Sequence, residues 1–382
     1  MCDIQNKVSS GRVGTITVPV TEAIGMVLAH DITEVRTGEF KGRAFRKGHV
    51  IREEDIGHLQ KLGKERLFVL NIAMDEMHED DAAFALANAL MGEGVEAEGE
   101  TKEGKINIIA CRNGLLKVNK QSLAQFNMLG DVMCATLHEH TVVKRGQVVA
   151  GTRAIPLVVK RNTVEHAAAI AGSCGKIIEV REMRGPKTGV VITGNEVYYG
   201  RIKDAFAPVI KRKIEELDGE IIGTYYAPDN EEFIEARLRE LVEAGADLLI
   251  TTGGMSVDPD DVTRFAIKRL GASGITYGSP VLPGSMFLIA YLNSSNGLKD
   301  KKDTEDLSLV TRHSSLPSDS SPIPIIGIPA CGMYHKTTVF DLILPRVLAG
   351  ENIGRRELAE LGHGGLCLNC KECRYPVCPF GK

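Results

Sequence analysis

The sequence predicts an α/β fold whose main domain is a three-layer, doubly wound and mostly parallel sheet. Short apolar runs that stop at a glycine precede Gly194 and Gly253, as expected for buried strands. Between them, Ile210, Ile214 and Leu217 repeat with the spacing of a helix face. The order of strand, helix and strand continues through this region, and it is typical of a parallel sheet with helices on both faces.

The composition divides the chain into four parts. We expect a small β-rich module at residues 1–73, a small α+β domain at 74–172, the α/β domain at 173–350 and a cysteine-rich, metal-binding tail at 351–382. Residues 293–324 are rich in Ser, Asp and Lys, which indicates a polar loop inserted between the last two strands. The alternative is disordered decoration without a role.

In the first part, the acids from Glu53 to Asp55 open a predicted helix that ends at Gly63. Four basic side chains near this helix could contact an anionic ligand or form a solvated surface. These side chains belong to Arg43, Arg46, Lys47 and Arg52.

In the second part, Asp80 or Asp81 is expected to cap an alanine-rich helix. Further along, the run INIIACRNGLLKV predicts a pair of strands joined around Asn113 and Gly114.

In the main domain, polar residues follow the predicted strands and precede the predicted helices. Asp204 comes before the helix marked by Ile210, and Asp229 with Asn230 offers capping oxygens to the next helix. Because ligands gather at the carboxyl ends of parallel strands, we expect one crevice to collect the following residues: Thr193, Glu196, Asp229, Gly253 and Asp261.

Residues 248–263, LLITTGGMSVDPDDVT, carry the strongest chemical signal of the main domain. The two glycines after the apolar run let backbone N–H groups approach an anion closely. Asp258, Asp260 and Asp261 offer hard oxygen ligands for Mg²⁺. The alternative is an acidic surface loop that caps the next helix.

Residues 176–350 contain TGNE, Gly200 and Asp204, the Asp229 turn and TTGGMSV. With this pattern they resemble the molybdopterin-binding domain of molybdopterin adenylyltransferases and molybdopterin molybdotransferases. Residues 23–33 and 45–70 resemble a small β-clip-like module of molybdopterin proteins. The resemblance implies catalytic or Mg²⁺-handling roles for Asp261, Glu196 and Asp229. It also implies contacts to the pterin or its adenylate from Thr193, Gly194, Asn195, Asp204, Thr252, Gly253, Gly254, Ser256 and Gly284.

Two stretches depart from the molybdotransferase pattern. Where that family has P-G-K-P and L-P-G-N-P, this chain has residues 283–286, PGSM, and residues 328–332, IPACG. A lysine is missing where an anion would favour one, so a charge-assisted contact is lost unless another Lys or Arg enters.

The resemblance implies Mg²⁺-dependent insertion of molybdate into adenylylated molybdopterin, with AMP displaced. A non-catalytic carrier or sensor of the finished cofactor is a second possibility. Adenylyl transfer from ATP to molybdopterin is a third. Expected partners are molybdopterin, molybdate and an adenine nucleotide, with a molybdoenzyme or a cofactor-maturation protein and a homo-oligomer also implied. Molybdate and tungstate are not distinguished.

The tail places Cys367, Cys370, Cys373 and Cys378 in a C-x2-C-x2-C-x4-C-P array. Thiolates two residues apart can turn inward around one centre, and the array resembles the bacterial ferredoxin run with one extra residue before its last cysteine. We expect a 4Fe–4S cluster, with Zn²⁺ as the main alternative and free thiols or a disulfide as the third.

Composition excludes several classes of protein. The amino terminus MCDIQNKVSSGR lacks the apolar core of a secretion signal, and no stretch has the length of a membrane span. We therefore expect a cytoplasmic protein with reduced thiols. A net charge of −4 and the absence of tryptophan give no nucleic-acid footprint.

Overall fold

A computed structural model describes the chain at residues 15–36, 40–70, 72–102, 104–173, 175–255, 261–293 and 321–382. It divides into two compact units, Met1–Glu182 and Met183–Lys382. Within the described ranges, no helix combines the length and the apolar character that crossing a membrane requires. The four-part division by residue number stays a prediction.

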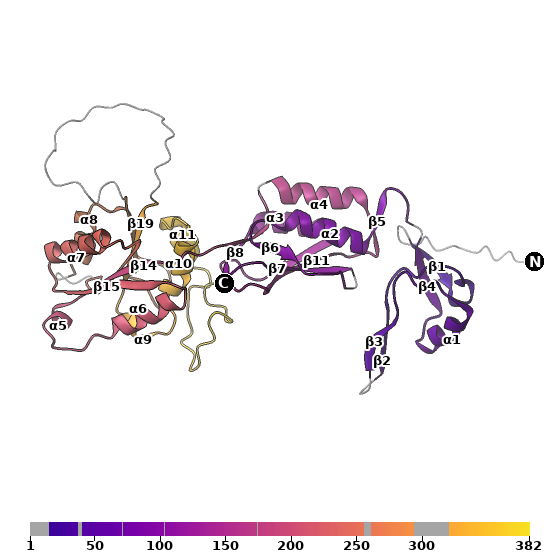
Figure 1. Cartoon of the computed structure of the whole chain (residues 1–382), viewed down its shortest axis with the longest axis horizontal. Coiled ribbons are helices and arrows are strands. Elements are labelled where there is room, and N and C mark those ends of the chain that lie inside the picture. Colours follow the sequence, from indigo (N-terminus) through magenta and orange to yellow (C-terminus); the bar gives the residue numbers. More distant parts are fainter. Residues whose placement is uncertain are drawn as a thin grey trace, which may run out of the picture. The chain divides into compact units, whose positions relative to one another are not determined.

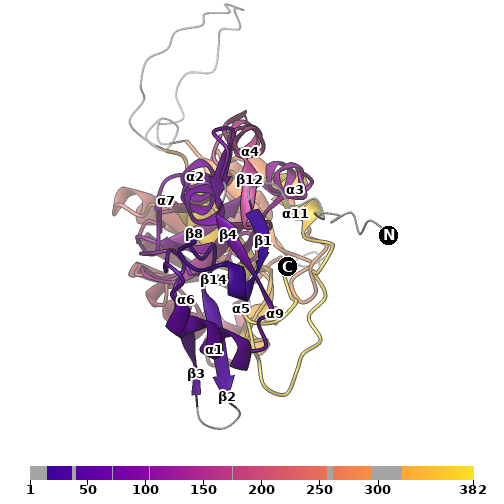
Figure 2. The ribbon, with the colours of Figure 1, turned by 90° about the vertical axis from the view of Figure 1, so that its right-hand side faces the viewer.

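The first unit begins with a small β-rich module. Its elements are β1 (Thr15–Pro19), the 3₁₀ turn η1 (Val20–Glu22), β2 (Ile32–Arg36), β3 (Phe40–Phe45), α1 (Glu53–Lys61) and β4 (Arg66–Leu70). β1 pairs with β4 and β2 with β3, both antiparallel, around a core that includes Leu28, Ile51 and Leu59. Figure 2 shows the β2–β3 hairpin extending away from β1 and β4. The helix predicted from Glu53 is confirmed.

The rest of the first unit is an α+β arrangement. Its elements are β5 (Glu76–His78), α2 (Glu79–Leu90), β6 (Val95–Ala97), β7 (Lys105–Ala110), β8 (Gly114–Val118), α3 (Lys120–Asn127), β9 (Val132–Thr136), β10 (Val142–Val143), β11 (Val148–Ala154), β12 (Val158–Lys160), α4 (Arg161–Ser173) and β13 (Ile178–Arg181). The strands form antiparallel sheets in the orders β6-β7-β11-β9, β10-β8-β13 and β12-β5. One core cluster contains residues of α2, α4 and these sheets.

Two local predictions in this unit were wrong. The α2 helix is capped by His78, whose side chain accepts from the Asp80 N–H at 3.1 Å, because β5 runs directly into the helix. Asp80 and Asp81 instead lie in the first turn, where carboxylates complement the positive end of the helix dipole.

The strands on either side of Asn113 exist but do not pair with each other. β7 pairs with β6 and β11, whereas β8 pairs with β10 and β13. The Asn113 side chain accepts from the Arg145 N–H at 3.0 Å, so it binds another segment instead of forming a tight hairpin turn. The predicted basic surface is partly neutralised, since Arg43, Lys47 and Arg52 form ion pairs with Asp31, Asp80 and Glu54.

The second unit contains the predicted α/β sheet. Its elements are β14 (Lys187–Thr193), α5 (Asn195–Tyr198), α6 (Phe206–Glu215), β15 (Glu220–Ala227), α7 (Glu231–Glu243), β16 (Leu248–Thr252), α8 (Thr263–Arg269), β17 (Ser273–Tyr277), β18 (Leu288–Leu292), β19 (Ile323–Ile328), α9 (Cys331–Tyr334), α10 (Val339–Leu348) and α11 (Arg355–Glu360). The strand order is β15-β14-β16-β19-β18-β17. The first four strands run parallel, and β18 and β17 are antiparallel.

Helices cover both faces of this sheet, which confirms the doubly wound fold (Figure 1). Alternate residues of β14 point to opposite faces, as the pleat requires. Val190 and Ile192 pack with α6 and α10, while Val191 packs with α7 and α8. The polar loop expected at residues 293–324 lies outside the described residues at 294–320, and Ile323 and Pro324 already belong to β19.

Candidate functional site

Two neighbouring strands end at the same edge of the sheet, and a buried threonine joins them. Thr193, the last residue of β14, donates its hydroxyl proton to the Thr252 carbonyl of β16 at 2.8 Å. The Thr193 oxygen lies 3.1 Å from the hydroxyl of Thr263 in α8. Since Thr193 has only one hydroxyl proton, Thr263 is the donor in that second bond. The hydroxyl chain fixes both strand ends against the start of α8.

The glycine corner after β16 requires its two glycines. Gly253 and Gly254 have φ values of +78° and +57°, in the left-handed region that favours glycine. A Cβ atom at Gly253 would clash with the Thr193 carbonyl, and one at Gly254 would clash with the Thr263 hydroxyl. The close approach that demands glycine is therefore made by the same threonines that brace the corner.

A crevice of about 450 Å³ opens beside this corner, and we call it the strand-end crevice. It is lined by Gly253, Gly254, Met255 and Asp261 and by residues 282–286 and 329–331. Both stretches that depart from the molybdotransferase pattern therefore contribute to its wall. Among these described lining residues Asp261 is the only charged one, so no Lys or Arg replaces the missing lysine here.

A second glycine corner lies in this wall. Gly284 has a φ of +128°, and a Cβ atom there would meet Val339 at the start of α10. The structure therefore brings together Gly253, Gly254, Asp261 and Gly284 from the residues expected at the site. Thr193 and Thr252 are only 3% and 0% exposed, so they lie beneath the corner and do not belong to the described lining of the crevice.

Other predicted site residues lie at neighbouring strand ends. Asn195 and Asp229 bind each other: the Asn195 N–H donates to the Asp229 carboxylate at 3.0 Å, and the Asp229 N–H donates to the Asn195 side-chain oxygen at 3.3 Å. This pair joins the ends of β14 and β15. Glu196 follows in α5 as an exposed residue, and it does not belong to the described lining of the strand-end crevice. Gly194, with a φ of +136°, forms the turn between β14 and α5.

Asp204 caps a helix. Its carboxylate accepts from the N–H groups of Phe206 and Ala207 at 2.8 and 3.0 Å, and from the Tyr226 hydroxyl at 3.3 Å. Burial and the nearby Asp204 charge raise the pKa of Tyr226, so this hydroxyl keeps its proton. The predicted contacts from Ser256, Asp258 and Asp260 fall outside the described residues.

Sequence reasoning did not select Thr263, Met255 or Cys331 as site residues. Thr263 ends the DPDDVT run, but nothing in the spacing shows that its hydroxyl reaches Thr193 on another strand. Cys331 lines the strand-end crevice, and burial raises the pKa of its thiol, which favours the protonated form. The position of Cys331 just after β19 was the one signal in the sequence that could have marked it as a site residue.

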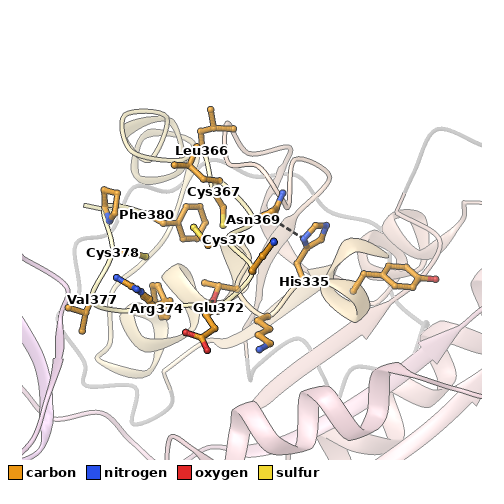
Figure 3. Close-up of a pocket in the computed structure, with 18 residues that line it drawn as sticks. His335, Leu366, Cys367, Asn369, Cys370, Glu372, Arg374, Val377, Cys378 and Phe380 are labelled. Atoms are coloured by element: carbon orange, nitrogen blue, oxygen red, sulfur yellow. Dashed lines mark hydrogen bonds between the residues drawn. The ribbon is translucent and has the colours of Figure 1, made fainter.

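The four tail cysteines line one hollow, a cavity of about 970 Å³ that we call the cysteine cavity. Its walls are residues 334–337, 366–375 and 377–380. Figure 3 shows Cys367, Cys370 and Cys378 around it. His335 also lies in the wall.

The thiols of the cysteine cavity are not gathered as metal ligands are. In the described part of the chain, no three His, Cys, Asp or Glu side chains are close enough together to hold a metal ion. Cys370 and Cys373 are exposed, and Cys367 and Cys378 are half-buried. The Thr337 hydroxyl lies 3.3 Å from the Cys373 sulfur, and this contact, together with a bond from the Tyr375 backbone, lowers the pKa of that thiol.

Residues 189–349 match a family described as a probable molybdopterin binding domain, and residues 17–71 match a domain of unknown function, DUF8806. A CinA-like protein of Mycobacterium avium (strain 104) is 39% identical over 224 residues, which cover 51% of each chain. A CinA-like protein of Mycolicibacterium gilvum is 37% identical over 83 residues, covering 22% of this chain and 20% of the relative. This chain thus spans at most about half the length of these curated relatives.

Among solved structures, this chain is similar to the tungsten cofactor synthesizing protein MoaB from Pyrococcus furiosus. The aligned part covers 43% of this chain and 96% of the MoaB chain, with 16% sequence identity and a TM-score of 0.29. The family match covers the sheet, the glycine corners and the strand-end crevice, and it stops before the cysteine-rich tail. Residues 189–349 of the second unit thus match the family described as a probable molybdopterin binding domain.

Proposed function

We propose that the strand-end crevice binds adenylylated molybdopterin and that the protein inserts molybdate into it with release of AMP, in a Mg²⁺-dependent step. The observation that carries this proposal is the convergence of the Gly253–Gly254 corner, Gly284 and Asp261 on one crevice of the matched domain. Positive-φ glycine corners bring backbone N–H groups close to an anion, which suits the phosphate end of the pterin.

Asp261 fits the Mg²⁺ requirement. Mg²⁺ is usually held by one or two carboxylates together with substrate phosphates and water, so a single described carboxylate beside an anion-binding corner is a suitable donor set. When bound, Mg²⁺ would neutralise charge on the phosphate and orient it. Without a lysine in the described lining, recognition of the anion depends on backbone N–H groups and on that ion.

The Asn195–Asp229 pair and the Thr193 hydroxyl chain would act as positioning elements. They join the ends of β14, β15 and β16, so the glycine corners keep their places relative to one another when ligand is absent. Positioning of this kind can supply much of a rate enhancement. For Glu196 and Asp204 we propose roles at the rim only, because one is exposed in α5 and the other caps α6.

The test is to incubate the purified protein with adenylylated molybdopterin, Mg²⁺ and molybdate, and to measure AMP. Insertion predicts AMP release that needs both Mg²⁺ and the oxyanion. Pyrophosphate release from ATP and molybdopterin would instead support adenylyl transfer. If neither product forms but the pterin binds, the protein is a carrier or sensor, which the absence of Lys and Arg from the described crevice lining would favour.

We further propose that Cys367, Cys370, Cys373 and Cys378 hold a 4Fe–4S cluster or Zn²⁺. The support is that all four line one cavity in an irregular segment, and such segments commonly gain their order from a bound metal. Reduced thiols suit the cytoplasmic location expected from the sequence. A brown anaerobic preparation with iron and sulfide would support the cluster, and a colourless protein with one Zn²⁺ per chain would support zinc.

A further inference from the structure

The strand-end crevice and the cysteine cavity share one continuous stretch of chain, residues 329–337. Its first three residues line the crevice, and its last four line the cavity. The single turn α9 joins them: the Gly332 N–H donates to the Pro329 carbonyl at 2.9 Å, and the His335 N–H donates to the Cys331 carbonyl at 3.1 Å. A hydrogen-bonded turn therefore joins the cavity end of this stretch to its crevice end.

A second connection runs through Leu282. This residue lines the crevice beside the Gly284 corner. Its N–H donates to the Gly365 carbonyl at 2.8 Å, and its carbonyl accepts from the Cys367 N–H at 2.8 Å. The first cysteine of the array is thus hydrogen-bonded through its backbone to the wall of the crevice.

Side chains add two contacts within the cavity. The Thr337 hydroxyl lies 3.3 Å from the Cys373 sulfur, and His335 Nδ1 lies 3.0 Å from the Asn369 side-chain oxygen, as the dashed line in Figure 3 shows. In each contact one partner, His335 or Thr337, belongs to residues 329–337. The cysteine-bearing loop therefore holds this stretch at two points.

The loop is anchored at its carboxyl-terminal end, while its central cysteines are not buried. Phe380 is 3% exposed, and the Tyr375 hydroxyl donates to the Asp341 carbonyl at 3.2 Å. Cys370 and Cys373 are exposed. To surround one centre, the thiols must move inward, and the exposed ones have the most room to do so. Such a movement would displace Asn369 and Cys373, the residues that contact His335 and Thr337.

We propose that metal loading of the cysteine cavity controls the strand-end crevice: a thiophilic ion or cluster bound by the four cysteines fixes residues 329–337 and Leu282, and so sets the crevice's affinity for its anionic ligand. The identity of that ligand rests on the proposed function, whereas the coupling between the two sites does not. The tail is then a regulatory metal switch of the molybdopterin-binding domain.

Coupling of this kind is reciprocal. If metal raises the affinity of the crevice for its ligand, the ligand raises the affinity of the cavity for metal by the same factor, typically about 5- to 150-fold. This reciprocity provides a check that a merely structural tail would fail.

Cys331 provides a reporter of the crevice that needs no pterin. Full-length protein loaded anaerobically with Zn²⁺, or with iron and sulfide, is compared with chelator-stripped protein during iodoacetamide treatment, and each cysteine is followed by peptide mass spectrometry. We expect the alkylation rate of Cys331 to differ severalfold between the two forms. The half-buried Cys111 of the first unit is the internal control and should keep its rate. Equal Cys331 rates in loaded and stripped protein would overturn the proposal.

A double variant tests the route. His335→Ala with Thr337→Val removes both side-chain contacts but leaves all four cysteines, so metal should bind at unchanged stoichiometry while the alkylation rate of Cys331 no longer responds to metal. Lys336→Ala is the matched control, because it changes a side chain of the cavity wall between these two residues but neither contact. A full response in the double variant would contradict a route through residues 329–337.

The outcomes separate this inference from the proposed function. A metal-dependent Cys331 rate without AMP release would keep the coupling and reject the transferase. AMP release that is the same in loaded and stripped protein, with constant Cys331 rates, would keep the transferase and reject the coupling.

Discussion

The strand-end crevice and the cysteine cavity lie in the same unit but are built in different ways. The crevice stands on the carboxyl edge of a buried sheet, and its glycine corner is fixed by a chain of buried threonine hydroxyls. The cavity lies in an irregular segment in which two of the four thiols are exposed. The shape of the crevice is therefore set by buried contacts within the protein, whereas the fold leaves two thiols of the cavity exposed.

The difference also divides the chemistry. The described crevice lining offers backbone N–H groups and one carboxylate, which suit a phosphate and a hard ion. The cavity offers thiols, which select soft or borderline metals. Four experiments on single residues sharpen this comparison.

The largest effect is expected from Asp261→Ala. It removes the only described carboxylate of the crevice wall, so Mg²⁺-dependent AMP release should fall at least about 100-fold, as loss of positioning at a reacting group can cause. The free energy of unfolding, measured with urea, should change by less than about 1 kcal/mol, because a partly exposed loop carboxylate contributes little to stability.

Glu243→Ala, an exposed carboxylate at the end of α7, is the control for the Asp261 variant and should retain full turnover. Unfolding of Asp261→Ala would show that this residue is a structural cap and not part of the binding machinery.

Gly253→Ala tests whether the crevice is preformed. The added methyl group combines an unfavourable φ with a clash against the Thr193 carbonyl, so we expect a loss of stability of about 1–3 kcal/mol and a fall in AMP release of about 10- to 100-fold. Gly271→Ala has a φ of +93° but open space around it, and it therefore measures strain without the clash. If both variants behaved alike, the close approach of the two strand ends would have no role.

Thr193→Val measures the hydroxyl chain itself. It leaves the Thr252 carbonyl and the Thr263 hydroxyl without their shared partner, which should cost about 1–3 kcal/mol of stability and about tenfold in turnover. Thr188→Val, in the same strand, is a matched control, since the Thr188 hydroxyl is buried and has no hydrogen-bond partner within the described residues. That control should lose no stability, and a comparable loss in both would refute the bracing role.

The smallest effect is expected from Glu235→Gln, a substitution in the helix α7, which packs on one face of the sheet. Burial raises the pKa of Glu235, but hydrogen bonds from Arg239 and Arg269 outweigh it and hold the pKa below 4.5. A lowered pKa contributes stability above pH 4.5 that is lost as pH falls through the folded-state value. The variant should therefore be less stable than the parent at pH 7, and urea unfolding should show the difference shrinking below pH 4.5, with AMP release unchanged.

A pH-independent difference for Glu235→Gln would contradict the ion-pair account of the α7 to α8 contact. Glu243→Gln, at the exposed end of α7, should match the parent at every pH.

The sequence predicted the sheet well because strand ends and helix caps are encoded locally. The apolar run before Gly253 is β16, Asp204 caps α6, and Asn230 caps α7 by accepting from the Phe233 N–H at 2.9 Å. In each case the residue and its partner lie within a few positions of one another. Local spacing is enough information to place such elements.

Contacts between distant segments were not predictable in the same way. Thr193 and Thr263 are 70 positions apart, and their hydroxyls meet only because β14 and β16 are neighbours in the sheet. Asn113 failed as a hairpin turn because its side chain binds Arg145, 32 positions away. The link between Leu282 and Cys367 likewise depends on the path of the tail.

The measurement that tests the central claim most directly is a crystal structure of the full chain with adenylylated molybdopterin and Mg²⁺. We predict that a phosphate of the ligand lies within hydrogen-bond distance of the backbone N–H groups at Gly253 and Gly254, with the metal ion beside Asp261. A ligand seated away from this corner, for instance against the cysteine cavity or beyond the rim at Glu196, would contradict the account.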